Sequence, residues 1–347
     1  VFKVGSSTLV DEAGSLDRVF IRSLCDQVVA LREAGNQVVV VSSGAAAAGR
    51  DALGLSSRPS DMATLQACAS VGQTALTEAY AEVLRERGVL CGQVLLTRRD
   101  VVDRDAYLNA RNTLTRLLEL GAVPVVNEND TVSVAEFTFG DNDMLGAIVS
   151  ALVGADLYII LSDVDGLYTA NPSVDPTATL IPEVTQVDRS ISARAGDSSS
   201  SFGTGGMSSK VRAARGMMEA GIPTVICEGT RFRPPADATP EAGRKLWIGL
   251  AEVVHGTIEL DEGAAAAVLG HGASILPVGV SRVEGTFEAG EVVNVTNPAG
   301  ELIGRGVVGY SSDDMLRVRG LKLEVIARFL GEAAAVPAVH RDELLVL

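Results

Sequence analysis

Short apolar runs recur along the first two thirds of the sequence, and longer amphipathic stretches separate them. Runs this short and rich in Val, Ile and Leu are typical of parallel strands buried on both faces of a sheet. Between the first two runs, apolar residues from Leu16 to Leu31 recur at helical spacing, and AGN at 34–36 predicts the helix end. The pattern predicts βαβ units, and therefore an α/β fold: a three-layer αβα sandwich around a mostly parallel sheet. The runs are VFKV (1–4), QVVVV (37–41), QVLL (93–96), AVPVVN (122–127), LYIIL (157–161) and PTVI (223–226).

The amino-acid composition of the sequence changes near residue 229. The stretch GTRFRPPADATPEAGRKLW is rich in Pro, Gly and charge, and this composition predicts a linker. Short alternating strands with regular turns follow over residues 256–335. We therefore predict a large α/β domain over residues 1–250 and a small β-rich domain over residues 256–347 that ends in a C-terminal tail.

Composition excludes several classes of function. A net charge of -15 argues against a protein that binds nucleic acid through a basic surface. No apolar run reaches the roughly 18 residues of a membrane helix, and no signal sequence is visible, so we expect a cytoplasmic protein without membrane contact. The chain begins at Val1, within a strand pattern, so we expect native residues before it.

Cysteine and histidine usage narrows the chemistry further. The four cysteines are widely spread and form no CxxC or Cys/His cluster, so we expect reduced thiols and neither a disulfide nor a zinc site. All three histidines lie in the C-terminal third. A catalyst in the first 250 residues must therefore use lysine, carboxylates and backbone dipoles.

Polar motifs follow the predicted strands, where ligands of such sheets bind. Ser42, Ser43 and Gly44 precede an Ala-rich helix. The serines can be N-caps, or their hydroxyls and the nearby N–H groups can bind a carboxylate, and the two interpretations are compatible. NEND (127–130) and FGDNDMLGA (139–147) can form turns or hold calcium, but they lack the EF-hand layout. Such Asn and Asp clusters suit an ammonium group together with oxygen atoms, as in an α-amino acid.

A glycine loop, FGTGGMSSK (202–210), fits neither the P-loop nor the dinucleotide pattern, yet it leads into a helix whose first turn carries Lys210. Lys3, beside Gly5, is either a solvated strand residue or a second cation that faces the same phosphoryl group. Ser162 and Asp163 end an apolar run, where they either hold adenine or ribose or simply form a turn. The stretch GDSSSSFGTGG (196–206) predicts a mobile loop.

Seven motifs, taken in this order, resemble the amino acid kinase family, and the C-terminal part resembles a PUA domain. Within the family they are similar to the members that use ATP to phosphorylate the side-chain carboxylate of L-glutamate. This resemblance implies a kinase that makes L-glutamyl 5-phosphate in the first step of proline biosynthesis. The motifs are KVGSSTL, VSSGAAAAGR, LLTRRD, NENDTV, FGDND, LSDVDGLYTANP and GTGGMSSK.

The resemblance also implies roles for single residues. Lys3 and Lys210 match the lysines that neutralise the transferred phosphoryl group, and Asp143 matches the aspartate that orients them. The residues matching the glutamate site are Ser43, Gly44, Asn127, Asp130 and Asn142. The residues matching the ATP site are Lys3, Ser162, Asp163, Thr204, Gly205, Gly206, Met207, Ser208, Ser209 and Lys210.

Cofactors and partners follow from the same resemblance. It implies ATP, with Mg²⁺ held by phosphate oxygens and water rather than by a dedicated protein site. It also implies feedback inhibition by L-proline at the glutamate site, a homo-oligomer, and transfer of the product to glutamyl phosphate reductase. The sequence departs from the family pattern between Glu228 and Gly229, where a longer segment is usual.

The sequence leaves two alternatives open. One is another small-molecule carboxylate or carbamate kinase of the same family, although an acetylated amino acid would leave Asp130 without an ammonium partner. The other is an RNA-binding protein acting through the PUA-like domain. In residues 256–347, however, acidic side chains outnumber basic ones by about two to one, which is a poor surface for a polyanion.

Overall fold

The computed structural model describes residues 1–346 apart from 12–14, 58, 134–141, 173, 189–190, 192–193, 195–205, 228, 235–247, 249–253 and 332–333. The chain divides into two compact units, Val1–Gly243 and Arg244–Leu347. Within the described part, no helix is long and apolar enough to cross a membrane.

The first unit is built on a sheet with the strand order β3-β4-β2-β1-β5-β7-β8-β6. Each of the six predicted apolar runs overlaps one of its strands, which confirms them. Among the described pairs of neighbouring strands, all are parallel except β7 with β8. The strands are β1 (Phe2–Val4), β2 (Val40–Ser42), β3 (Cys91–Leu96), β4 (Val123–Glu128), β5 (Tyr158–Leu161), β6 (Glu183–Val184), β7 (Thr224–Ile226) and β8 (Thr230–Phe232).

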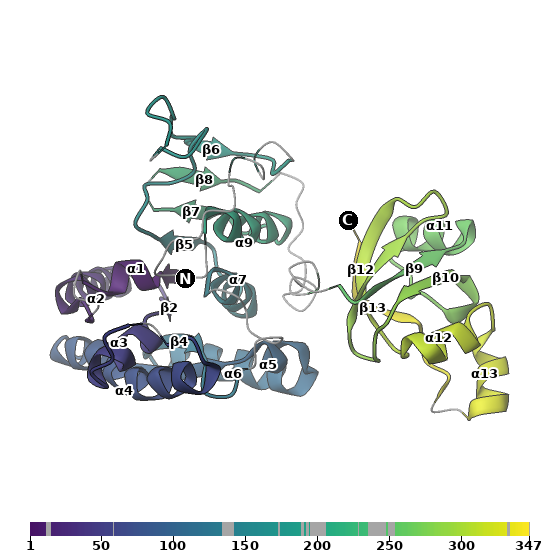
Figure 1. Ribbon diagram of the computed structural model, residues 1–347, viewed down its shortest axis with the longest axis horizontal. Helices are drawn as coiled ribbons and strands as arrows, with labels where there is room; N and C mark the ends of the chain where they lie inside the picture. Colours follow the sequence, from purple (N-terminus) through teal and green to yellow (C-terminus); the bar gives the residue numbers. More distant parts are fainter. Residues whose placement is uncertain are drawn as a thin grey trace. The chain divides into compact units, whose positions relative to one another are not determined.

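Helices cover both faces of this sheet, so the predicted three-layer α/β fold is confirmed (Figure 1). Apolar side chains of α2 and α4 share one buried cluster with those of β1, β2 and β4. On the other face α7 contacts the central strands, and it packs beside α9. The helices are α1 (Ser6–Leu9), α2 (Arg18–Glu33), α3 (Ala45–Ala52), α4 (Met62–Glu86), α5 (Arg98–Val102), α6 (Arg104–Glu119), α7 (Asn142–Val153) and α9 (Met207–Glu219).

Local signals explain where these helices begin and end. Asp17 caps α2 by accepting hydrogen bonds from two backbone N–H groups of its first turn, and α2 ends just before Gly35, as predicted. The N-cap of α3 differs from the expectation, because it is Gly44 and neither preceding serine caps the helix. Gly44 has a φ of 92°, a left-handed conformation that is costly for any residue with a Cβ.

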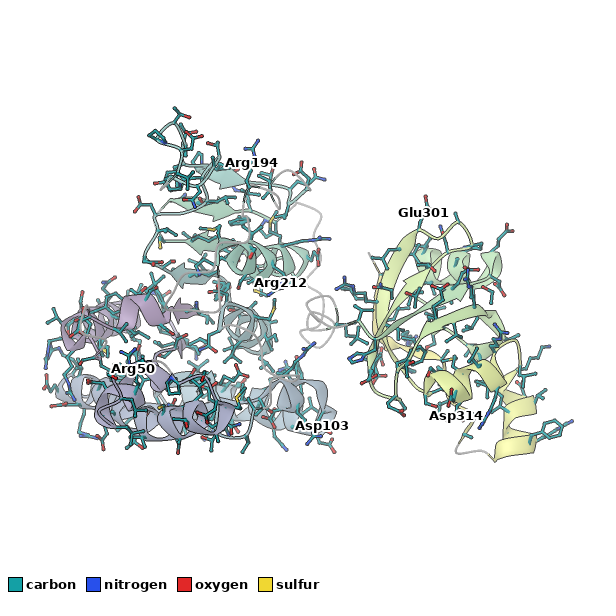
Figure 2. All side chains as sticks on the ribbon, in the orientation of Figure 1. Arg50, Asp103, Arg194, Arg212, Glu301 and Asp314 are labelled. Carbon is teal, nitrogen blue, oxygen red and sulfur yellow. The ribbon has the colours of Figure 1, made fainter. Side chains whose placement is uncertain are left out.

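The second unit is a sheet with the order β10-β9-β11-β12-β13. Its strands are β9 (Gly256–Leu260), β10 (Val280–Gly285), β11 (Val292–Thr296), β12 (Leu302–Val308) and β13 (Val339–Val346). Its helices are α11 (Glu262–His271), the short 3₁₀ helix η2 (Pro277–Gly279), α12 (Ser312–Val318) and α13 (Leu323–Leu330). Figure 2 labels two acidic side chains of this unit, Glu301 before β12 and Asp314 on α12.

Two expectations are wrong, one about the end of the first unit and one about the end of the second. The predicted linker does not begin at residue 229, because Thr230 and Phe232 are fully buried in β8 while Arg231 between them is exposed. Thr230 donates a hydrogen bond to the carbonyl of Ile181, a contact that composition does not reveal. The predicted C-terminal tail is strand β13, which pairs antiparallel with β12.

Candidate active site

Lys3 lies on the central strand β1, with only 4% of its surface exposed. Successive side chains of a strand point to opposite faces. Phe2 and Val4 pack into the cluster formed with α2 and α4, so Lys3 points to the other face, toward α7. The strand pattern that buries its neighbours therefore also places this ammonium group inside the protein, which excludes the solvated interpretation.

Asp143 joins Lys3 to Lys210, although the three residues come from three separate elements. Lys3 Nζ lies 2.5 Å from Asp143 Oδ1, and Lys210 Nζ lies 3.1 Å from Oδ2. Asp143 is in the first turn of α7 and Lys210 is in the first turns of α9. Ser209 Oγ donates a further hydrogen bond to Asp143 Oδ2 at 3.1 Å. We call Lys3, Asp143, Ser209 and Lys210 the lysine cluster.

The lysine cluster carries an excess of positive charge. Asp143 is fully buried and Lys210 is 7% exposed, so two ammonium groups share one carboxylate with little help from water. Burial works to raise the pKa of Asp143, but the charges of Lys3 and Lys210 and their hydrogen bonds hold it below its usual value. A buried group of two cations and one anion favours an anionic ligand.

The N-terminus of α9 adds backbone donors beside this charge. Its N-cap is Gly206, and the backbone N–H groups of a helix N-terminus point toward a ligand and favour an anion. Met207 and Ser208 lie in that first turn. Thr204 and Gly205, together with most of the predicted mobile loop, lie outside the described residues.

Next to the lysine cluster, the predicted amino-acid residues form a network of uncharged groups. Asn142 Nδ2 donates hydrogen bonds to Ser43 Oγ at 2.8 Å and to Asn127 Oδ1 at 2.9 Å, and it also lies 2.9 Å from the carbonyl oxygen of Ser42. Because Asn142 and Asp143 are consecutive at the start of α7, the network and the lysine cluster are adjacent. We call Ser43, Asn127 and Asn142 the amide network.

Asp130, the predicted partner of an ammonium group, follows Asn127 by three residues in the sequence. It lies in the turn that follows β4, two residues after Glu128. Burial raises the pKa of Asp130 to about 6. A partly buried carboxylate with a raised pKa gains stability from a cationic ligand, because the cation offsets the cost of burying its charge.

The next two predicted site residues are Ser162 and Asp163. They follow β5, the neighbour of β1, and Ser162 Oγ donates to Asp163 Oδ1 at 3.0 Å. The backbone N–H of Ser162 donates to Cys227 Sγ, and Cys227 is the one described non-glycine residue with a positive φ, of 50°. Across the described residues no group of three His, Cys, Asp or Glu side chains forms a candidate metal site.

Sequence reasoning missed two residues that hold the site together. Tyr158 OH donates to the backbone carbonyl of Asp143 at 2.7 Å, and Gln73 Oε1 accepts from Asn127 Nδ2 at 2.8 Å. Tyr158 begins an apolar strand and Gln73 lies within the long helix α4, so both look like ordinary members of their elements. The available signal is weak: each is a residue with a polar tip in a mostly apolar segment.

Comparison with known proteins identifies the family of the chain. Residues 1–228 match the amino acid kinase family, and residues 256–330 match the PUA domain. Over its whole length the chain is 43% identical to the glutamate 5-kinase of Trichlorobacter lovleyi and covers 96% of that protein. It is also 43% identical to the glutamate 5-kinases of Moorella thermoacetica and Caulobacter vibrioides, covering 96% of each. The chain therefore belongs to the amino acid kinase family, groups with the glutamate 5-kinases within it, and carries a PUA domain.

Proposed function

We propose that this protein transfers the γ-phosphoryl group of ATP to the side-chain carboxylate of L-glutamate, giving ADP and L-glutamyl 5-phosphate in the first step of proline biosynthesis. The observation that carries the proposal is the lysine cluster, in which Asp143 bridges two buried lysines beside an amide network. The 43% identity to glutamate 5-kinases over the whole chain supports the same reaction.

The proposed reaction needs little covalent help from the protein. A carboxylate oxygen of glutamate attacks the γ-phosphorus, and the bond from that phosphorus to the β–γ bridging oxygen breaks. Since the carboxylate is already ionised near pH 7, no general base is required. This agrees with a site made of lysines, carboxylates and amides. Catalysis then consists of positioning the two substrates and stabilising the charge on the phosphoryl group.

We assign this stabilisation to Lys3 and Lys210, held in place by Asp143. Two ammonium groups on either side of one carboxylate are fixed before substrate arrives, so no reorganisation is needed during transfer. The backbone N–H groups at the start of α9 would bind phosphate oxygens at the same place. The proposal also assigns Thr204 and Gly205 to ATP binding, and Ser162 and Asp163 would contact the nucleoside.

We assign recognition of the amino acid to the other half of the site. Asp130 would pair with the ammonium group of glutamate, and Ser43 with the backbone N–H of Gly44 would bind the α-carboxylate. Asn127 and Asn142 would supply the remaining hydrogen bonds. The amide network is uncharged, and a zwitterionic group needs directional dipoles more than it needs net charge.

Mg²⁺ belongs to this proposal as a partner of ATP. Both oxygens of Asp143 already face lysines, so the buried carboxylate nearest the phosphoryl site is committed. We therefore assign the metal ligands to the ATP phosphates and water, which is usual for Mg²⁺. When bound, the ion would neutralise phosphate charge.

We further propose that L-proline competes for the glutamate site, since it has the same ammonium and carboxylate groups that Asp130 and Ser43 would recognise. A homo-oligomer, a cytoplasmic location and delivery of the product to glutamyl phosphate reductase are also part of the proposal. The support for these three is membership of the family.

A coupled assay of ADP release tests the reaction. Mg-ATP is combined in turn with L-glutamate, N-acetylglutamate, L-aspartate, carbamate and UMP, and hydroxylamine is added to trap an acyl phosphate. We expect glutamate-dependent ADP release and a γ-glutamyl hydroxamate. Turnover with another acceptor and none with glutamate would contradict the proposal and would reassign Asp130 and Asn142.

A further inference from the structure

We propose that Gln73 is a positioning residue, which fixes the orientation of the Asn127 amide and through it the amide network that receives the amino acid. The inference rests on the proposed function, because it uses the glutamate site assigned above. Gln73 lies on α4, a helix that carries none of the predicted site residues.

The first step is a continuous chain of hydrogen bonds from α4 into the site. Gln73 Oε1 accepts from Asn127 Nδ2 at 2.8 Å, and Asn127 Oδ1 accepts from Asn142 Nδ2 at 2.9 Å. Asn142 Nδ2 then reaches Ser43 Oγ at 2.8 Å. The chain therefore joins α4, β4, the start of α7 and the loop after β2.

The second step is the polarity of this chain, which Thr77 sets at its outer end. The hydroxyl of Thr77 donates to the backbone carbonyl of Gln73 at 2.9 Å, one helical turn earlier. Its oxygen therefore acts as an acceptor, and it accepts from Gln73 Nε2 at 3.1 Å. Because the nitrogen of the Gln73 amide faces Thr77, its oxygen must face Asn127.

The third step carries this polarity to the ligand. With its nitrogen held by Gln73, the Asn127 amide presents Oδ1 to Asn142, and the backbone N–H of Glu128 donates to the same oxygen at 2.9 Å. The Asn142 nitrogen is then used within the network. Ser43 Oγ is an acceptor inside the network, so its own proton is available to a substrate carboxylate.

A second glutamine of α4 supports the same segment from its other end. Gln66 lies seven residues before Gln73, which is two helical turns along the same face. Its Nε2 donates to the carbonyl oxygen of Ser133 at 2.9 Å. Thus α4 holds both ends of the segment from Asn127 to Ser133, with Asp130 between them.

The test uses the full chain and measures kcat, the KM for glutamate, the KM for ATP and the melting temperature. Gln73→Met keeps the length of the side chain but removes both hydrogen bonds. We expect its KM for glutamate to rise about tenfold, as for a partly buried donor left without a partner, while its KM for ATP stays within about twofold. Thr77→Val, a milder change, should raise the KM for glutamate about threefold.

Gln93→Met is the matched control. Gln93 is exposed on β3 and donates to the same Thr77 oxygen at 3.0 Å, whereas the Asn127 amide is hydrogen-bonded by Gln73. We expect all its kinetic constants to stay within about twofold of the unmodified protein. A rise in its KM for glutamate equal to that of Gln73→Met would overturn the inference.

A double-mutant cycle with Asn127→Ala separates positioning from general loss of structure. If Gln73 acts through Asn127, adding Gln73→Met to Asn127→Ala should change the KM for glutamate no further. Independent, multiplicative effects would overturn the inference, and so would an unchanged KM in both Gln73→Met and Thr77→Val. Absence of glutamate-dependent turnover in the unmodified protein would instead overturn the proposed function, and this inference with it.

Discussion

The two halves of the candidate site, the lysine cluster and the amide network, differ in their electric charge. The lysine cluster buries two cations against one anion and is anchored by ion pairs of 2.5 and 3.1 Å. The amide network contains no formal charge and is anchored by hydrogen bonds between amides, a hydroxyl and backbone groups. The difference follows from the proposed ligands, because a phosphoryl group in transfer carries net charge whereas the end of an amino acid is a zwitterion. Variants of each half should therefore fail in different ways.

The largest effect is expected from Lys210→Ala. Asp143 keeps Lys3 as its partner, so the fold survives while the excess positive charge disappears. We expect kcat to fall by about 10²–10³-fold, as when a preorganised charge donor is removed. Steady-state kinetics and a melting curve check this. The control is Lys322→Ala, which replaces an exposed lysine of the second unit. Near-normal kcat in Lys210→Ala would show that the lysine cluster does not take part in phosphoryl transfer.

Asp143→Asn should damage stability as well as activity. It leaves two buried lysines without a counter-charge, and breaking a buried ion pair in this way costs about 3–5 kcal/mol. Urea unfolding measures the loss. The same unfolding measurement is repeated with ATP or inorganic phosphate, which should stabilise Asp143→Asn more than the unmodified protein. Equal stabilisation of both would mean that the lysine cluster does not bind the anion.

Asp130→Asn should act on the amino-acid end alone. Loss of a charge-assisted hydrogen bond of about 1.5–3 kcal/mol predicts a KM for glutamate raised about 10- to 150-fold, with the KM for ATP little changed. Competition kinetics with both substrates varied will measure the two constants. Comparable increases in the KM for glutamate and the KM for ATP would show that Asp130 does not recognise glutamate specifically.

The pH dependence of the same residue gives a prediction with a definite sign. Since burial raises the pKa of Asp130 to about 6, its carboxylate is ionised above that pH and protonated below it. We expect kcat/KM for glutamate to fall as pH drops below about 6 in the unmodified protein, and this inflection to be absent from Asp130→Asn. The raised pKa also means that ionised Asp130 destabilises the empty fold, so Asp130→Asn should melt at a higher temperature at pH 8. A lower melting temperature would contradict the burial argument.

The smallest effect is expected from Ser43→Ala. One neutral hydrogen bond is worth about 0.5–1.5 kcal/mol, so the KM for glutamate should rise roughly 2- to 12-fold while kcat barely changes. Ser42→Ala is not a suitable control, because Ser42 Oγ hydrogen-bonds buried Tyr80. Ser281→Ala, on an exposed strand of the second unit, serves instead. A large loss of kcat in Ser43→Ala would contradict the assignment of Ser43 to amino-acid binding alone.

The sequence by itself determined the architecture of the first unit and indicated which residues form the candidate site. Apolar runs gave all six predicted strands because burial on both faces demands Val, Ile and Leu, and the polar motifs followed those runs because their carboxyl ends meet at one edge. It could not reveal β8 or β13. In β8 only three residues alternate between buried and exposed, and the Pro- and Gly-rich stretch that follows hid the pattern.

Only the tertiary structure decided how the site residues are held. That Asp143 faces both lysines depends on the register of β1, α7 and α9, which no local pattern encodes. That Gln73 sets the direction of the Asn127 amide depends on a contact between residues 54 positions apart. Burial produces a periodic pattern of apolar residues in the sequence, whereas a hydrogen bond between distant side chains produces no such pattern. The sequence therefore identifies the residue types of the candidate site, and packing determines their orientation.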